Sequence, residues 1–200
     1  MLTPRPIGGF TLIELLVALT LAAILLALGA PAMSQYLQIA KVGASTQSLH
    51  AGLQAARTEA IRRNRPVEFV LTNMSVTATN IASAVVASST GVNWVVRAAS
   101  GPASAPEYDL VDAKAAAESA GGDPTSVVIA ASGAFPGTLT FNGFGGVTAP
   151  TTFTVRHLSA PACPGAGAIR CRLVRISGGG QVSTCDPDVT NADDTRFCRP

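Results

Sequence analysis

Gly8-Gly9-Phe10-Thr11-Leu12-Ile13-Glu14-Leu15-Leu16 sets the organisation of this 200-residue chain. Two glycines end a short polar leader, an aromatic residue follows, and the apolar run that it opens carries one carboxylate, Glu14. Residues 15–33 carry no charge, and at about 1.5 Å of rise per helical residue they nearly match the hydrocarbon core of a bilayer. The pattern predicts a membrane-spanning helix that contains a single ionisable group.

This segment resembles the N-terminal signal of type IV prepilins and type II secretion pseudopilins. The resemblance implies that a prepilin peptidase cuts between Gly9 and Phe10, that Phe10 becomes an N-methylated terminus, and that Glu14 becomes the fifth residue of the mature chain. Pro31 also falls where these helices often carry proline. An ordinary membrane anchor and a secretory signal peptide are the alternatives, although a secretory signal usually places small residues after a shorter apolar core.

Glu14 needs a partner, because an ionised carboxylate within lipid costs on the order of 2.5–3.5 kcal/mol or more. The amine that cleavage would create at Phe10 lies one helical turn from Glu14 on the same face. In a bundle of such helices, the carboxylate of one subunit can meet the amine of its neighbour. Pairing would turn a costly buried charge into a signal that fixes the register between subunits.

Composition allows one membrane helix and one small globular domain, with 48% hydrophobic and only 5% aromatic residues. A net charge of +2 gives no general indication of nucleic-acid binding. All four cysteines lie in the last 38 residues, which favours disulfides and therefore an oxidising compartment for this part. We expect a single-pass inner-membrane protein with a cytoplasmic leader and a periplasmic C-terminal domain, which then enters a pilus or pseudopilus.

The helix is expected to continue to residue 65, as a membrane-spanning part at 10–33 and an amphipathic part at 34–65. Residues 53–63, followed by Pro66-Val67, resemble the helix-to-strand junction of the GspH/FimT branch of pilins, with its Ala-Arg-x-Glu-Ala-Ile core. This resemblance implies an α+β pilin fold, with a long N-terminal transmembrane helix packed on a small antiparallel β-sheet domain. The domains would be a cleaved leader at 1–9, the helix at 10–65 and a periplasmic β domain at 66–200.

Alternating apolar and polar residues predict several strands in the second half of the chain. The expected strands lie at 67–72, 83–87, 93–97, 126–131, 138–141, 152–155, 169–176 and 181–184. Residues 98–124 look like a variable insertion with a short helix at 108–120. Glycines at 178–180 predict a hairpin turn, and a second Gly-rich turn follows the strand that ends at Phe141.

The four cysteines lack the C-x-x-C pair that structural zinc sites commonly use, so no metal site is expected. Of the three disulfide connectivities we favour Cys163–Cys171 with Cys185–Cys198, since each closes a short loop that would stabilise the fold by about 3 kcal/mol. Cys171–Cys185 is the competitor, because the Gly178 hairpin would bring these two together. The Cys185–Cys198 pair resembles the C-terminal disulfide loop of many type IV pilins.

Catalysis and cofactor binding have no support, because neither His50 nor His157 lies near a nucleophile motif or at a metal-ligand spacing. A basic patch is the one alternative of another class. Its residues fall in a span without carboxylates, and Arg170 and Arg172 would share one strand face: Arg156, His157, Arg170, Arg172 and Arg175. Such a patch could hold DNA phosphates, and some FimT-like minor pilins bind DNA through a basic C-terminal motif.

Two features argue against DNA binding. The Gly-Arg-x-Arg run is absent, and Asp186, Asp188, Asp193 and Asp194 would weaken the local potential. The ordinary alternative is a solvated strand face. The expected function is therefore that of a structural minor subunit of a type IV pilus, which initiates or caps filament assembly with other pilins. The alternatives are minor pseudopilin H of a type II secretion system and DNA capture in natural transformation.

Overall fold

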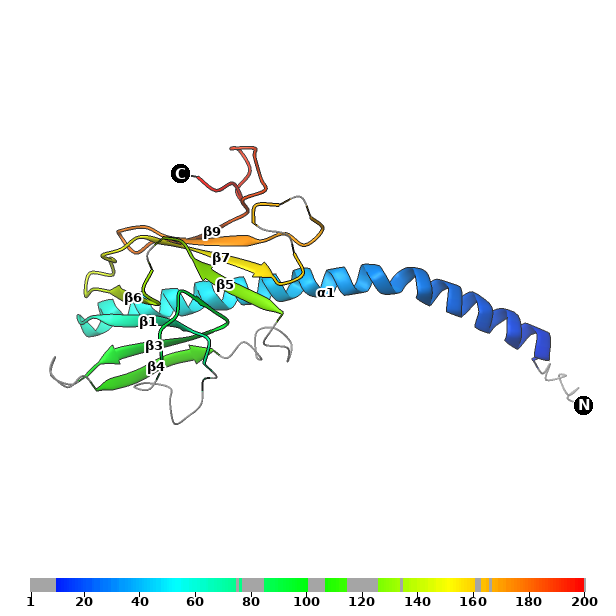
Figure 1. Ribbon diagram of the computed structural model, residues 1–200, viewed down its shortest axis with the longest axis horizontal. Helices are drawn as coiled ribbons and strands as arrows, with labels where there is room; N and C mark the ends of the chain where they lie inside the picture. Colours follow the sequence, from blue (N-terminus) through cyan, green and yellow to red (C-terminus); the bar gives the residue numbers. More distant parts are fainter. Residues whose placement is uncertain are drawn as a thin grey trace, which may run out of the picture. The chain divides into compact units, whose positions relative to one another are not determined.

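The computed structural model describes residues 10–74, 76, 85–100, 107–114, 126–133, 135–160, 163–165 and 167–199, with the side chains of 28–31 left out. The chain divides into two compact units, Met1–Leu37 and Gln38–Pro200. One long helix, α1 (Leu12–Arg63), belongs to both units, and the strands lie in the second (Figure 1).

Nine strands follow α1 within the described residues. They are β1 (Val67–Thr72), β2 (Thr90–Gly91), β3 (Asn93–Ala99), β4 (Tyr108–Lys114), β5 (Val127–Ala131), β6 (Thr138–Phe141), β7 (Thr151–His157), β8 (Arg172–Ile176) and β9 (Val182–Cys185). Strict alternation of buried and half-buried residues along β7 shows one face toward the core and one toward solvent.

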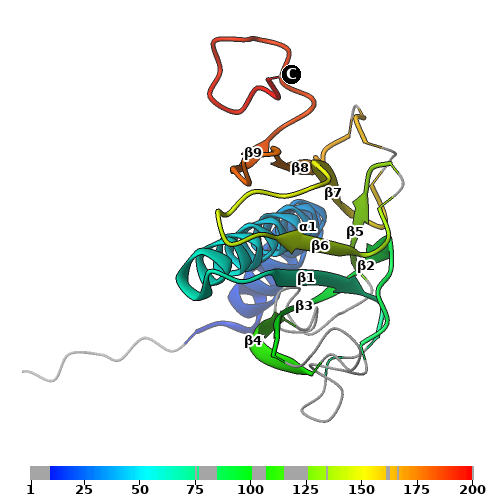
Figure 2. The ribbon, with the colours of Figure 1, turned by 90° about the vertical axis from the view of Figure 1, so that its left-hand side faces the viewer.

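The strands form two antiparallel sheets, ordered β4-β3-β1-β6 and β2-β5-β7-β8-β9. Both sheets curve around the C-terminal part of α1 (Figure 2). The helix buries one stripe against them, formed by Val42, Leu49, Leu53, Ala56 and Ala60. The predicted α+β class, with a long apolar helix packed on antiparallel sheets, is confirmed.

Aromatic rings join the two sheets across the core. Phe69 of β1 stacks on Trp94 of β3 at 5.6 Å between ring centroids, and it meets Phe153 of β7 edge-on at 6.0 Å. On the helix side, Trp94 lies directly on Gly52, where an added Cβ would fall 2.7 Å from the indole ring. Gly52 is therefore a packing position, since even one methyl group would collide with Trp94.

Four sequence expectations need correction. Residues 108–114 form β4 rather than the start of a helix, because they pair with β3 and Arg97 lies over the Tyr108 ring at 3.8 Å; residues 115–120 lie outside the described part. Residues 98–99 therefore belong to the sheet and not to an insertion. The expected strand at 83–87 is absent from its described residues 85–87, where Val85 packs beneath Val70. The strand expected at 169–176 begins only at Arg172.

The C-terminal end of α1 is closed by backbone and side-chain contacts. Asn64 adopts a left-handed φ of 48° just after the helix, and Pro66 cannot continue it. Glu59 bonds Arg62 at 2.6 Å and Arg63 at 2.5 Å, while Arg63 reaches Asp109 of β4 at 3.0 Å. The expected Glu59–Arg63 pair is thus present and ties the helix end to the edge of the first sheet.

This cluster predicts a pH dependence. Hydrogen bonds from Arg62 and Arg63 lower the pKa of Glu59 from 4.5 to about 2. A carboxylate whose pKa is depressed by folding stabilises the fold above its unfolded pKa and loses that contribution as the pH falls through the folded one. Between pH 4.5 and 2, the free energy of unfolding of the Glu59→Gln chain, measured by denaturant titration, should fall less steeply than that of the wild type. Equal slopes would contradict the assignment.

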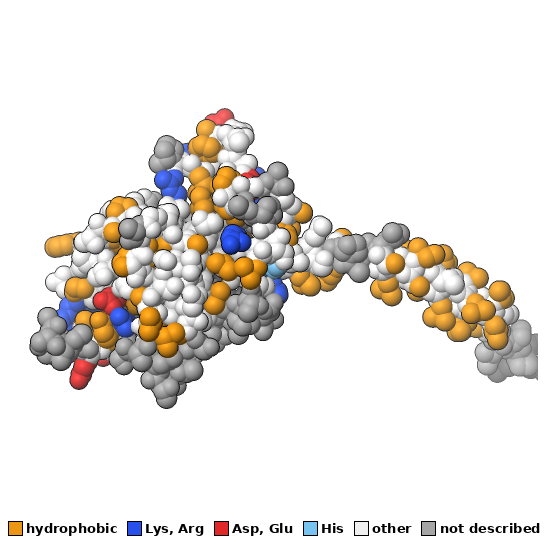
Figure 3. Space-filling model, viewed as in Figure 1, with side chains coloured by type: hydrophobic (Ala, Val, Ile, Leu, Met, Phe, Trp, Pro, Cys, Tyr) orange, Lys and Arg blue, Asp and Glu red, His pale blue; other side chains and the backbone are white. Residues whose placement is uncertain are grey.

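Within the first unit, the described residues from Leu12 onward form a largely apolar helix. Its described large hydrophobic side chains are exposed, among them Leu12, Leu19, Leu21 and Leu26, and orange hydrophobic side chains dominate this part in Figure 3. Among the described residues, α1 is the helix long and apolar enough to cross a membrane. An unpartnered apolar surface of this size requires lipid or other apolar helices around it.

Candidate functional site

The start of α1 holds the predicted assembly residues. Phe10 precedes the helix and is 86% exposed, while Gly9 lies outside the described residues. Thr11 caps the helix, since its hydroxyl accepts a hydrogen bond from the backbone N–H of Glu14 at 3.3 Å. Thr11-x-x-Glu14 has the spacing of a capping box, so this pair also helps to start the helix.

Glu14 is exposed among apolar side chains. It lines a shallow groove of about 400 Å³ together with Ile13, Val17, Ala18 and Leu21. No Lys or Arg forms an ion pair with it within the residues that the structure describes. A carboxylate in such surroundings can form an ion pair with a cationic group of another molecule. The helix N-terminus also favours its negative charge.

Both disulfides adopt the pairing that the sequence favoured. Cys163 bonds Cys171 with 6.0 Å between their Cα atoms, and Cys185 bonds Cys198 with 5.0 Å. The competing Cys171–Cys185 pairing is therefore not formed. The second bond closes residues 185–198 into what we call the C-terminal loop.

Asp186 anchors the C-terminal loop to the sheet. Its side chain is 1% exposed, and its carboxylate accepts a hydrogen bond from Arg172 at 2.5 Å while Arg170 lies 3.8 Å away. The loop is also tied to the other disulfide-closed segment, because the N–H of Gly165 donates to the carboxylate of Asp188 at 3.1 Å. The sequence placed these aspartates near the arginines but did not identify Asp186 as a buried partner.

The predicted basic patch is dispersed. Arg170 lies before β8, so it does not share a strand face with Arg172, and both arginines face Asp186. Arg156 and Arg175 lie on the outer face of the second sheet, near opposite ends of β7, roughly 13 Å apart by strand rise. His157 is buried, and its Nδ1 accepts a hydrogen bond from the N–H of Ser159. The structure therefore does not bring these residues together as one cationic surface.

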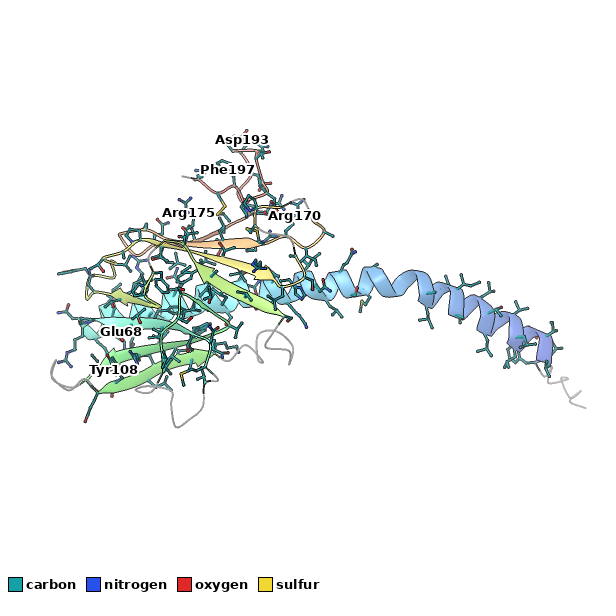
Figure 4. The ribbon with its side chains drawn as sticks, in the orientation of Figure 1. Glu68, Tyr108, Arg170, Arg175, Asp193 and Phe197 are labelled. Carbon is teal, nitrogen blue, oxygen red and sulfur yellow. A yellow bond between two sulfur atoms is a disulfide. The ribbon has the colours of Figure 1, made fainter. Side chains whose placement is uncertain are left out.

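A groove that sequence reasoning missed lies between the outer face of the second sheet and the C-terminal loop. We call it the C-terminal groove; it encloses about 670 Å³. Its main lining residues are Thr152, Arg175, Ser183, Thr195, Phe197 and Arg199. Figure 4 shows Arg175 on the sheet and Phe197 in the loop next to it. No single stretch of sequence signals this groove, because its lining comes from several strands and from the C-terminal loop.

Within the described ranges, no group of three His, Cys, Asp or Glu side chains could hold a metal ion. The arrangement at Glu14 supports association of helices, and the arrangement around the C-terminal loop supports binding at a surface.

Comparisons with known proteins support the resemblance of the N-terminal segment to the prepilin signal. The profile of the family described as "Type II transport protein GspH" matches residues 45–180, and that of the "Prokaryotic N-terminal methylation motif" matches residues 5–30. A search of curated proteins found no match. Together with the apolar helix, the motif indicates an inner-membrane anchor that precedes a C-terminal domain.

Similar solved structures include those of three proteins. The Pseudomonas aeruginosa type IV minor pilin FimU is 19% identical and has a TM-score of 0.43, over 71% of this chain and 86% of that chain. Escherichia coli GspH is 14% identical with a TM-score of 0.43, over 78% and 93%. The minor pseudopilin EpsH from the type 2 secretion system of Vibrio cholerae is 13% identical with a TM-score of 0.41, over 75% and 98%.

The GspH profile covers more than half of the chain, and the methylation motif precedes it at the start of α1. Family membership implies assembly with other pilins or pseudopilins in a filament. The chain thus belongs to the GspH family of minor pilins and pseudopilins.

Proposed function

We propose that this protein is a structural minor subunit of a type IV pilus, which initiates or caps the filament after processing by prepilin peptidase. Cleavage would remove residues 1–9 between Gly9 and Phe10, and Phe10 would be N-methylated. Residues 10–33 would span the inner membrane, residues 34–65 would continue the helix, and residues 66–200 would lie in the periplasm. The observation that carries the proposal is Glu14, an exposed carboxylate without a cationic partner among the described residues, at the start of an apolar helix.

Assembly would follow from the free-energy cost of placing the Glu14 carboxylate in lipid. In lipid, Glu14 is stabilised when the Phe10 amine of an adjacent subunit enters the groove beside Ile13 and Val17. Apolar side chains on every side of the first unit then pack against neighbouring helices. A polar pair inside an apolar bundle fixes the axial offset between subunits, because any other offset leaves both charges unpaired.

The C-terminal loop favours the pilus over the secretion system, since the Cys185–Cys198 closure resembles that of type IV pilins. Minor pseudopilin H of a type II secretion system is the alternative within the same class. DNA capture in natural transformation is weaker, because Arg170 and Arg172 are both engaged near Asp186.

Deletion of the gene from its own strain tests this proposal. The deletion should reduce surface pili strongly while type II secretion continues, and the wild-type chain should restore the pili. A Gly9→Val chain should fail to restore them and should keep residues 1–9, as measured by intact mass, because the proposed cut follows this glycine directly and valine is much bulkier.

Gly8→Ala serves as the matched control, since it leaves the residue at the cut unchanged and should be processed. Loss of secretion with normal pili would assign the chain to the secretion system. A mature chain that begins anywhere other than Phe10 would overturn the proposed processing.

A further inference from the structure

The floor of the C-terminal groove is a row of polar side chains that crosses the second sheet. Thr152 of β7 lies opposite Arg175 of β8, and Arg175 lies opposite Ser183 of β9. Ser132 extends the row, because its hydroxyl accepts a hydrogen bond from the N–H of Thr152 at 3.3 Å. Neighbouring strands lie about 4.8 Å apart, so one guanidinium group has hydroxyls on both sides at regular spacing.

The C-terminal loop forms the wall. Thr195, Phe197 and Arg199 line the groove, whereas the residues between them are engaged elsewhere. Arg196 pairs with Asp194 at 2.7 Å, and Cys198 bonds Cys185. Thr195 contributes a hydroxyl to this wall, Phe197 an aromatic ring and Arg199 a guanidinium group.

Several contacts hold the wall in place. The N–H of Asp186 donates to the carbonyl of Arg196 at 2.7 Å, and Asp186 and Phe197 form a parallel β-bridge. Arg175 donates to the carbonyl of Arg199, which joins floor and wall within the groove. A site held by a disulfide, a bridge and side-chain bonds loses little conformational entropy when a ligand binds.

The side chains that line the C-terminal groove favour particular chemical groups in a ligand. It contains no Asp or Glu side chain, whereas it contains two arginines, seven serine or threonine residues and Phe197. Guanidinium groups bind carboxylates through paired N–H donors, hydroxyls exchange hydrogen bonds with hydroxyls, and a ring face packs on apolar C–H surface. We propose that the C-terminal groove binds an acidic saccharide.

In this site, the sugar carboxylate would lie against Arg175 and Arg199. The sugar ring would pack on Phe197, and its hydroxyls would bond the row of Thr152 and Ser183. A nucleic acid fits less well, because affinity for a polyphosphate grows with the number of cations and this groove offers two. The site is independent of the proposed filament function.

The test is a ligand-observed NMR titration of the full chain in detergent with trigalacturonic acid, a trisaccharide that carries three carboxylates. Binding is expected, and the neutral trimethyl ester should bind at least about tenfold more weakly. Arg175→Gln should weaken binding of the acid by about tenfold or more, and Phe197→Ala by several-fold. Phe197 lies in the wall of the groove and outside the core clusters. Phe197→Ala therefore tests the proposal even if Arg175→Gln disturbs the loop.

Arg156→Gln is the matched control, since Arg156 lies on the same outer face of β7 but outside the groove lining. It should leave the affinity unchanged within about twofold. The proposal is wrong if no binding occurs up to about 10 mM, if the ester binds as tightly as the acid, or if Arg156→Gln weakens binding as much as Arg175→Gln. Equal affinity for a tetradeoxynucleotide with three phosphates would show a general anion site and would also overturn it.

Discussion

A Glu14→Ala chain is expected to be cleaved and methylated normally and yet to stay out of filaments. The substitution leaves the leader unchanged but would remove the proposed acceptor for a neighbour's Phe10 amine, which would then be buried without a partner. Removing one member of a buried ion pair costs about 3–5 kcal/mol, which corresponds to at least a hundredfold loss in an association equilibrium. The amount of the chain in sheared filaments, relative to the membrane pool, measures the effect.

Three further variants separate charge from helix capping. Glu14→Gln keeps the capping-box spacing and the size of the side chain, so it should fail as badly as Glu14→Ala if charge is what matters. Thr11→Ala removes the hydroxyl that accepts the Glu14 N–H, and it should assemble nearly as well as the wild type. Thr20→Ala is the neutral control, since the Thr20 hydroxyl donates to the Val17 carbonyl of its own helix. Normal incorporation of Glu14→Gln would refute the pairing.

A Trp94→Ala chain is expected to lose about 3–5 kcal/mol of unfolding free energy. Trp94 is 4% exposed and lies between Gly52 of the helix and Phe69 of β1. Its replacement by alanine would leave a cavity between α1 and the first sheet. Such a loss is a large share of the 5–15 kcal/mol that stabilises a typical domain. Denaturant titration followed by far-UV circular dichroism measures it.

Two glycines of the same helix provide the matched comparison. Gly52→Ala should destabilise the fold, since its methyl group would lie 2.7 Å from the Trp94 ring and overpacking costs about 1–3 kcal/mol. Gly43→Ala should stabilise it by about 0.5–1 kcal/mol, because no described atom lies within 4 Å of the added Cβ. Combining Gly52→Ala with Trp94→Ala should cost less than the sum of the two. Equal effects at both glycines would contradict the packing assignment.

Much of the fold could be predicted because its signals are local. The uncharged run after Glu14, the stop at Asn64 and Pro66, and the alternation of residues 67–72 each depend on neighbouring residues alone. The disulfide pairing also followed from short loop lengths. These features appear in the structure as α1, β1 and the two bonds at Cys163 and Cys185.

The errors arose where distant residues decide the outcome. Residues 108–114 have a composition that suits a helix, but pairing with β3 and the contact of Tyr108 with Arg97 make them a strand. Asp186 lies 14 residues after Arg172, and nothing in their spacing reveals that its carboxylate becomes buried against that arginine. The C-terminal groove needs three strands and a disulfide-closed loop, so no single stretch of sequence indicates it.

The Cys185–Cys198 closure has a consequence for how this protein can diversify. The wall of the groove is built by the last residues of the chain, whereas Glu14 and the Gly52–Trp94 contact lie far earlier in the sequence. Substitutions between the two cysteines would therefore change the proposed binding surface without altering the residues proposed to drive assembly. Natural selection can alter the two properties separately, and so can an engineer who grafts a new loop onto the same scaffold.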